Sequence, residues 1–160
     1  MPYEPMTLTT ADAGQLLTLQ RAAYVTEAQA HRDLELPPLT ETLDELITEL
    51  VQPAVTALGI RDDTGRLIAA VRLPRMNHEP HAAELGRLVV APDQQGRGLG
   101  TQLLHHAEMH LQPRVTELRL FTGEHSEANL RLYGGHGYRK TGRTPTPAGY
   151  ALIHLTKHLN

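Results

Sequence analysis

Apolar positions along the chain fall into short runs typical of strands and into stretches with spacings of three and four residues, which are typical of helices. The short runs predict seven strands, at residues 6–9, 55–60, 67–73, 84–90, 117–122, 138–141 and 150–155. The helical spacing predicts four helices, which begin near residues 12, 43, 101 and 127. We therefore expect helices packed around a sheet, with no internal repeat and no linker.

Turn and capping residues set the expected limits of these elements. Thr10 or Asp12 is expected to cap the first helix, Thr42 and Glu45 to form a capping box at the second, and Ser126 to cap the last. The turn at residues 62–65 predicts a hairpin between the second and third strands. Two adjacent prolines predict a break in the chain at residues 36–39.

A glycine-rich segment, Gln95-Gly96-Arg97-Gly98-Leu99-Gly100, joins the strand at 84–90 to the helix that follows. Glycines at a helix start leave its free N–H groups accessible, and the helix dipole favours an anion there. The strand at 117–122 comes next, so the unit predicts a parallel pair with a right-handed crossover. We expect the loop to bind a phosphate or pyrophosphate.

The spacing of the glycines separates this loop from other phosphate loops. A Walker loop needs Lys followed by Ser or Thr after its glycines, and that pair is missing. A dinucleotide fingerprint needs Gly-x-Gly-x-x-Gly, whereas single residues separate the three glycines here, although Glu117 stands at about the distance of the acidic ribose ligand. A glycine-rich structural turn without a ligand is the remaining alternative.

The spacing Gln95-x-x-Gly98-x-Gly100 resembles the acetyl-CoA pyrophosphate loop of the GNAT superfamily of N-acetyltransferases. A second segment, from Asn129 to Tyr133 and on to Gly137-Tyr138, is similar to another signature of that family. The order of the predicted elements resembles the family over nearly the whole chain. The resemblance implies an α/β (α+β) GNAT fold, with a central mixed, mostly antiparallel sheet of about seven strands, one splayed parallel pair and about four helices. We expect residues 1–160 to form a single domain of this kind.

The resemblance implies an N-acetyltransferase that moves the acetyl group of acetyl-CoA directly to a primary amine within a ternary complex. It places the cofactor against Leu88, Val89, Val90, Gln95, Gly96, Arg97, Gly98, Leu99, Gly100, Thr101, Asn129 and Tyr133. Tyr133 matches the family tyrosine that protonates the coenzyme A thiolate. A phenol suits that role because its ordinary pKa of about 10 keeps it protonated at neutral pH.

Two carboxylates are candidates for the general base. Glu84 stands eleven residues before Gln95, a spacing that matches the base of histone-acetyltransferase members of the superfamily. Glu124 follows the next parallel strand. A solvated strand-end residue is the alternative interpretation of each, and many family members work without one dominant base.

The composition of the chain excludes several kinds of partner and of site. The formal net charge is −3 and no run of Lys or Arg occurs, so we expect no nucleic-acid surface. The absence of cysteine excludes disulfides, thiolate zinc sites and an acyl-cysteine intermediate. The histidine pairs at 78 and 81 and at 106 and 110 have no evident third ligand, so no metal is expected.

The chain contains no apolar run near the roughly 18 residues of a membrane span. Its start, Met1-Pro2-Tyr3-Glu4, does not resemble a signal peptide, so we expect a cytoplasmic protein without a membrane partner. Members of the resembled family often form homodimers, but no stripe in this sequence requires one.

The acceptor is expected between two loops, at about residues 30–39 and 142–149, by the resemblance. Asp33 and Glu35 in the first loop favour a cationic amine, whereas Arg143 in the second favours an acceptor that carries a carboxylate. The sequence leaves both open. A non-catalytic acyl-CoA-binding regulator is the alternative function, and the presence of Tyr133 and Glu84 favours the enzyme.

Overall fold

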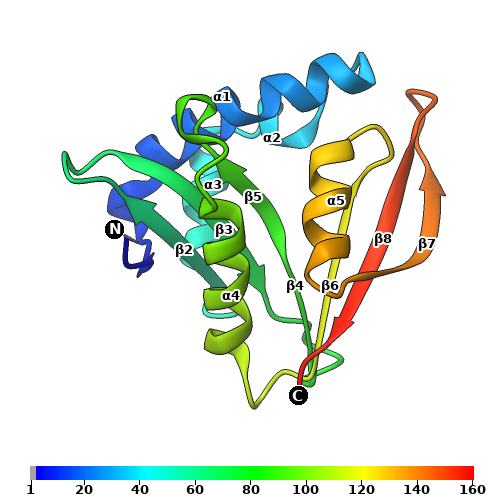
Figure 1. The fold of residues 1–160 in the computed structure, drawn as a ribbon. Coiled ribbons are helices and arrows are strands. Elements are labelled where there is room, and N and C mark those ends of the chain that lie inside the picture. Colours follow the sequence, from blue (N-terminus) through cyan, green and yellow to red (C-terminus); the bar gives the residue numbers. More distant parts are fainter. Residues whose placement is uncertain (1–2) are drawn as a thin grey trace.

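The computed structural model describes residues 3–160. Met1 and Pro2, which belong to the start that does not resemble a signal peptide, lie outside the described residues. Within residues 3–160, eight strands form two four-stranded sheets (Figure 1). The first sheet has the order β1 (Met6–Thr7), β2 (Val55–Arg61), β3 (Leu67–Pro74) and β5 (Gly86–Val90). The second has the order β4 (Ala82–Glu84), β6 (Glu117–Gly123), β8 (Ala151–His158) and β7 (Arg139–Pro145). The expected mixed α/β fold is confirmed, with one strand more than predicted.

The predicted strand at 84–90 is divided between the two sheets. β4 pairs in parallel with β6, which confirms the expected parallel pair, and β5 pairs antiparallel with β3. Leu85 donates its N–H to the Arg119 carbonyl at 2.8 Å, and Arg87 then adopts a φ of 52°. This left-handed residue turns the chain from one sheet to the other, so β5 and β6 diverge toward the top of Figure 1.

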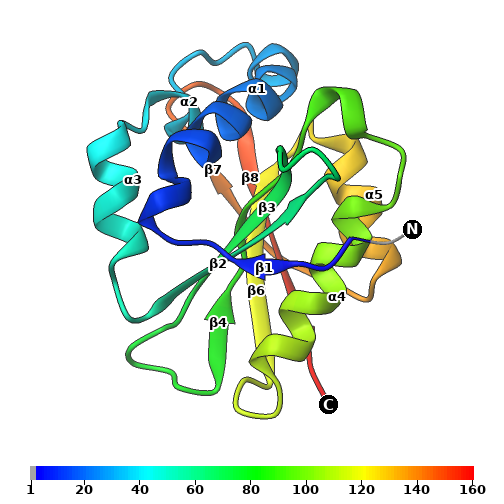
Figure 2. The ribbon, with the colours of Figure 1, turned by 90° about the vertical axis from the view of Figure 1, so that its left-hand side faces the viewer.

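Helices cover both faces of the first sheet. α1 (Ala13–His31) and α3 (Leu43–Leu50) pack on one face and α4 (Leu99–Leu111) on the other (Figure 2). Seven of the eight β3 residues are buried as a result, because side chains on both faces of that strand meet a helix. α5 (Glu127–Gly135) lies beside β6 (Figure 1). One core cluster includes buried residues from both sheets and from these helices.

Three predicted helix starts had different outcomes. The capping box of Thr42 with Glu45 is confirmed at α3. Asp12, one of the two expected residues, occupies the N-cap position of α1, but its side chain makes no capping bond there. It instead accepts the Thr9 N–H at 2.8 Å, and Thr9 caps the 3₁₀ turn at Thr10–Asp12 that precedes α1. Ser126 occupies the N-cap position of α5 but makes no capping bond, and its hydroxyl donates to Glu27.

The predicted break at residues 36–39 contains a further short helix, α2 (Pro37–Thr40). Its two prolines occupy the first positions, where a missing N–H costs no hydrogen bond. A second 3₁₀ turn, Pro92–Gln94, leads into the glycine-rich segment. No helix within residues 3–160 is both long and apolar enough to cross a membrane.

Candidate active site

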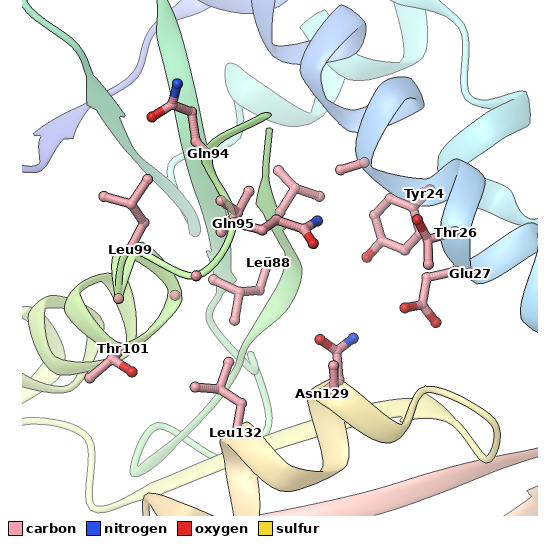
Figure 3. A pocket seen from close by; sticks show the side chains of 17 residues that line it. Tyr24, Thr26, Glu27, Leu88, Gln94, Gln95, Leu99, Thr101, Asn129 and Leu132 are labelled. Atoms are coloured by element: carbon pink, nitrogen blue, oxygen red, sulfur yellow. The ribbon is translucent and has the colours of Figure 1, made fainter. Parts of the chain in front are cut away.

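The first of two neighbouring cavities lies between α1, β5, the glycine-rich segment and α5 (Figure 3), and we call it the glycine-loop cavity. Its volume is about 310 Å³. All of the predicted cofactor residues except Arg97 and Tyr133 line it. Arg97 is exposed and does not line this cavity. The structure thus brings residues 88–90, the glycine-rich segment and Asn129 together around one hollow.

Two glycines shape the loop that borders this cavity. Gly96 and Gly98 have φ values of 80° and 78°, a region that side-chain-bearing residues rarely adopt. A Cβ built on either would meet nothing within 4 Å, so both face open space. α4 begins at Leu99, and its first helical bond joins the Gln102 N–H to the Gly98 carbonyl at 3.0 Å. The N–H groups of Leu99, Gly100 and Thr101 precede this bond, have no partner within the helix and are available to an anion.

The backbone of β5 presents further donors to the gap between the diverging strands. Ala91 donates its N–H to Ile68 on the neighbouring β3 at 2.8 Å. Successive N–H groups of a strand point to opposite edges, so those of Leu88 and Val90 point away from β3. Among the described residues no strand pairs with that edge of β5, which leaves these N–H groups available to a carbonyl oxygen.

The second cavity is larger, at about 640 Å³, and we call it the wide cavity. It lies between α1, the segment from Asp33 to Pro38, Leu85 with the first three residues of β5, residues 121–123 of β6 and the turn before β8. Four residues line both cavities: Tyr24, Glu27, Leu88 and Asn129. Figure 3 shows Tyr24 and Glu27 reaching from α1 toward Asn129 on α5, so the two cavities meet between these helices.

Tyr133 lines the wide cavity and is 4% exposed. Burial, followed by the nearby Tyr24 and Glu27, raises the pKa of Tyr133 above its ordinary value, and no hydrogen bond contributes to that shift. Its ring lies edge-on to Tyr138, with centroids 5.7 Å apart. Burial also raises the pKa of Tyr24 to about 12. Both phenols therefore keep their protons throughout the neutral range.

The two carboxylates expected as general bases lie outside both cavities. Glu84 is exposed at the end of β4, where it pairs in register with Arg119. Glu124 accepts the Ala151 N–H at 2.8 Å and an Arg143 N–H at 2.9 Å. These bonds, the first of them the larger, lower the pKa of Glu124 below its usual value. Glu124 thus joins β6 to the β7–β8 hairpin and is a weakened base.

Hydrogen bonds of His31 fix one part of the wall of the wide cavity. His31 is buried, donates its Nδ1–H to the Glu27 carbonyl at 2.9 Å and accepts the His125 N–H at Nε2 at 3.0 Å. Both ring nitrogens are therefore occupied in the neutral ring. Gly123 makes room for this ring, since a Cβ there would lie 2.2 Å from His31 Nε2.

No group of three His, Asp or Glu side chains in residues 3–160 is placed to hold a metal ion.

Sequence reasoning did not identify Tyr24, Glu27 or Arg87 as site residues. Tyr24 and Glu27 are three positions apart on a helix, so they share a face, but that face also carries ordinary core positions. Arg87 appears in the sequence as a polar residue of a strand, and only its left-handed backbone brings it to the wide cavity. No local sequence signal distinguishes these residues from their neighbours.

Comparisons with known proteins agree with this geometry. The family model described as the acetyltransferase (GNAT) family matches residues 17–138, which is more than half of the chain. A search of the curated proteins gave no significant match. Among solved structures, the chain is similar to the PaiA N-acetyltransferase from Thermoplasma acidophilum in complex with coenzyme A, with a TM-score of 0.81, 20% identity and 99% of each chain covered.

Two further structures are similar over almost their full lengths. The ribosomal-protein-S18-alanine N-acetyltransferase from Escherichia coli has a TM-score of 0.80 and 19% identity, with 99% of this chain and 95% of that chain covered. The spermidine/spermine N-acetyltransferase SpeG from Vibrio cholerae has a TM-score of 0.74 and 16% identity, with 99% and 95% covered. At these identities the likeness shows the fold alone. Because the family model covers most of its length, the chain belongs to the GNAT family of acetyltransferases.

Proposed function

We propose that the protein transfers the acetyl group of acetyl-CoA directly to a primary amine while both are bound. The observation that carries this proposal is the pair of joined cavities, one bordered by free helix N–H groups and the other by the diverging strands. Family membership supports acetyl transfer in general. The amine and the ternary mechanism are our extension of it.

The glycine-loop residues fit a diphosphate. Gly96 and Gly98 leave open space where side chains would otherwise stand, and the start of α4 supplies N–H donors. When bound, acetyl-CoA supplies an activated thioester. In our proposal the N–H groups of Leu88 and Val90 stabilise the oxyanion that develops on its carbonyl oxygen.

The remaining proton transfers fall to side chains that line the wide cavity. We propose that Tyr133 donates its phenolic proton to the sulfur as the carbon–sulfur bond breaks, and regains a proton from solvent. Glu27 is our proposed acceptor of the ammonium proton, because it is the carboxylate that lines both cavities. Glu84 and Glu124, expected from the sequence, are the competing candidates and would need a bridging water.

Two measurements test the proposed function. Isothermal titration is expected to detect coenzyme A and acetyl-CoA binding at sub-millimolar concentrations, and absence of both would end the proposal. A free-thiol release assay over a panel of amines is expected to exceed the hydrolytic background for at least one amine. Binding of acetyl-CoA with only background release for every amine would favour a non-catalytic acyl-CoA-binding regulator.

Substitution of Gly98 by alanine is expected to raise the dissociation constant of coenzyme A about tenfold or more. At a φ of 78° an alanine costs about 1–2 kcal/mol, and its methyl group would enter the open space of the loop. Titration calorimetry measures the effect. Gly14→Ala is the matched control, since Gly14 lies in α1 and a Cβ there also meets nothing within 4 Å. Equal affinities of Gly98→Ala and the unchanged protein would separate this loop from the cofactor.

The general base is tested by comparing three substitutions. Glu27→Gln is expected to lower kcat about 100-fold, because the amide still accepts the Ser126 hydrogen bond but takes no proton. Glu84→Gln and Glu124→Gln are expected to change kcat less than about tenfold, the range of a lost indirect effect. Steady-state kinetics with the best amine gives the ranking. A larger loss of kcat in Glu84→Gln would return the role of general base to a residue that the sequence favoured.

A cytoplasmic location, a homodimer and a single domain stay predictions.

A further inference from the structure

The backbone at Arg87 places a cation in the wall of the wide cavity. In a regular strand, consecutive side chains point to opposite faces. Here the four consecutive residues from Leu85 to Leu88 all line the wide cavity. The φ of 52° at Arg87 accounts for this departure, and such left-handed residues other than glycine are concentrated at functional sites. The conformation therefore directs Arg87 into the space where we propose that the acceptor binds.

The guanidinium of Arg87 lacks a protein partner within residues 3–160. Its Nε is buried and bonded to nothing. No carboxylate in this range lies at ion-pair distance from Arg87, although several arginines elsewhere have one: Arg61, Arg66, Arg72, Arg119 and Arg143. The charge of Arg87 still reaches Tyr24, whose pKa it lowers against the effect of burial. A buried donor without an acceptor is costly, so a ligand oxygen would restore its hydrogen bonding.

Two of the three acidic side chains that line the same cavity, Asp33 and Glu27, are already engaged, whereas that of Glu35 is not engaged by any described residue. Asp33 accepts the Tyr150 hydroxyl at 2.7 Å and the Glu35 N–H at 2.9 Å. Glu27 accepts the Ser126 hydroxyl. Of the two acids that favoured a cationic acceptor in the sequence, Asp33 thus spends part of its hydrogen-bonding capacity within the protein, and the Glu35 carboxylate has no such bond in residues 3–160. They give weaker support to a polyamine than their number suggests.

Arg143, the cation that the sequence favoured for a carboxylate, is not in this position. It does not line the wide cavity, its side chain is 62% exposed, and it is paired with Glu124 at 2.9 Å. Arg87 is the arginine that lines the cavity. Its planar fork of donors matches the two oxygens of a carboxylate.

The rest of the wide cavity presents apolar surface. Leu36, Pro37 and Pro38 line one side, and Phe121 and Leu152 line the other. Phe121 is 55% exposed, which is unusual for an aromatic ring on a sheet. An apolar group on the acceptor would cover this ring and shield it from water.

We propose that Arg87 binds the carboxylate of the acceptor, and that the acceptor is an amino acid with an apolar or aromatic side chain. This inference rests on the proposed function, since it identifies the amine that the site acetylates. The carboxylate bonds the Arg87 fork, the side chain lies against Phe121 and the prolines, and the amino group points to the junction at Glu27.

The test compares amino acids with the same compounds lacking the carboxylate. Thiol release is measured with L-leucine, L-methionine, L-phenylalanine and L-tyrosine, with their amides, and with phenethylamine and spermidine. We expect kcat/KM to be about 10- to 100-fold higher for at least one acid than for its amide, as is typical of a hydrogen-bonded charge. Arg87→Gln is expected to remove that preference by lowering kcat/KM for the acid only, and Arg87→Lys to retain part of it.

Two further variants sharpen the result. Arg66 forms a surface pair with Asp93, and neither residue lines either cavity, so Arg66→Gln is expected to leave kcat/KM unchanged for both acids and amides. Arg143→Gln is expected to keep the preference for the acid. The inference is overturned if amides or spermidine are the better acceptors, if Arg87→Gln lowers acid and amide equally, or if Arg143→Gln is the variant that loses the preference.

Binding to the protein saturated with coenzyme A separates failure of this inference from failure of the proposed function. Titration calorimetry of the same acids and amides is independent of turnover. Acid binding that is lost in Arg87→Gln would support the carboxylate site even if no amine were acetylated. If thiol release occurs with other amines while no acid binds better than its amide, the proposed function stands and this inference fails.

Discussion

Replacing Tyr133 with phenylalanine is expected to lower kcat about 10²- to 10⁴-fold, the usual range for loss of a positioned proton donor. The dissociation constant of coenzyme A is expected to change little, because Tyr133 lies outside the glycine-loop cavity. Burial keeps the phenol protonated, so the rate of the unchanged enzyme should not decline through loss of this proton between pH 7 and about pH 10. Steady-state kinetics and calorimetry measure the two effects separately.

Two other tyrosines serve as comparisons. Tyr138→Phe removes a hydroxyl from the same buried pair, but that hydroxyl donates to Glu108 at 3.1 Å, so a small effect on kcat is expected. Tyr24→Phe tests the other phenol near the junction of the cavities. A larger loss of kcat in Tyr24→Phe than in Tyr133→Phe would assign the proton donor to Tyr24. Unchanged turnover in both would remove tyrosine from the mechanism.

Replacing Arg72 with methionine is expected to lower the free energy of unfolding by about 3–5 kcal/mol, as is typical when one partner of a buried ion pair is removed. Arg72 is 2% exposed and donates to Glu41 at 2.8 Å and to Glu49 at 2.5 Å. It also donates to Gln20, whose amide bonds the Pro38 carbonyl at 2.8 Å. The substitution leaves the buried Gln20 amide oxygen and the partly buried carboxylates of Glu41 and Glu49 without this donor. Urea denaturation gives the loss.

The pH dependence of the free energy of unfolding tests the contribution of the Glu41 carboxylate. Burial raises the pKa of Glu41, but the hydrogen bonds from Arg72 and Gln20 and the charges of Arg72 and Arg87 together outweigh burial, so its pKa lies below the usual value. The stabilisation is therefore present above the pKa of unfolded glutamate, about 4.3, and is lost as the pH falls through the lower folded pKa. The difference between the two proteins should shrink on acidification. Arg66→Met, at the exposed pair with Asp93, should cost less than about 1 kcal/mol. An equal loss in both variants would contradict a special role for Arg72.

The Arg72 cluster also connects stability to the site. It joins β3 to α1 and, through Gln20 and Glu41, to the two ends of α2. Pro37 and Pro38 of α2 line the wide cavity. Loss of the cluster is thus expected to destabilise the wall of the wide cavity more than the glycine-rich segment.

Local sequence features predicted much of the fold. The hairpin of β2 and β3, the capping box at Thr42 and the parallel pair of β4 and β6 agree with the structure. Each depends on residues close in sequence or on the handedness of a crossover. The division of the strand at Leu85 was missed, because it depends on which sheet each half can reach. Ser126 is a similar case, since its competing partner, Glu27, is distant in sequence.

The sequence by itself determined the glycine-rich loop that we propose as the donor side of this protein. Three closely spaced glycines before an amphipathic helix define a loop whose conformation is local, so their pattern alone indicated an anion site at residues 95–101. Only the tertiary structure decided the wide cavity, where we propose that the acceptor binds. Tyr24, Glu27 and Arg87 become neighbours of one cavity through the packing of α1 against β5 and the left-handed turn between the sheets. Contacts between residues so far apart in sequence depend on packing, and no local pattern encodes them.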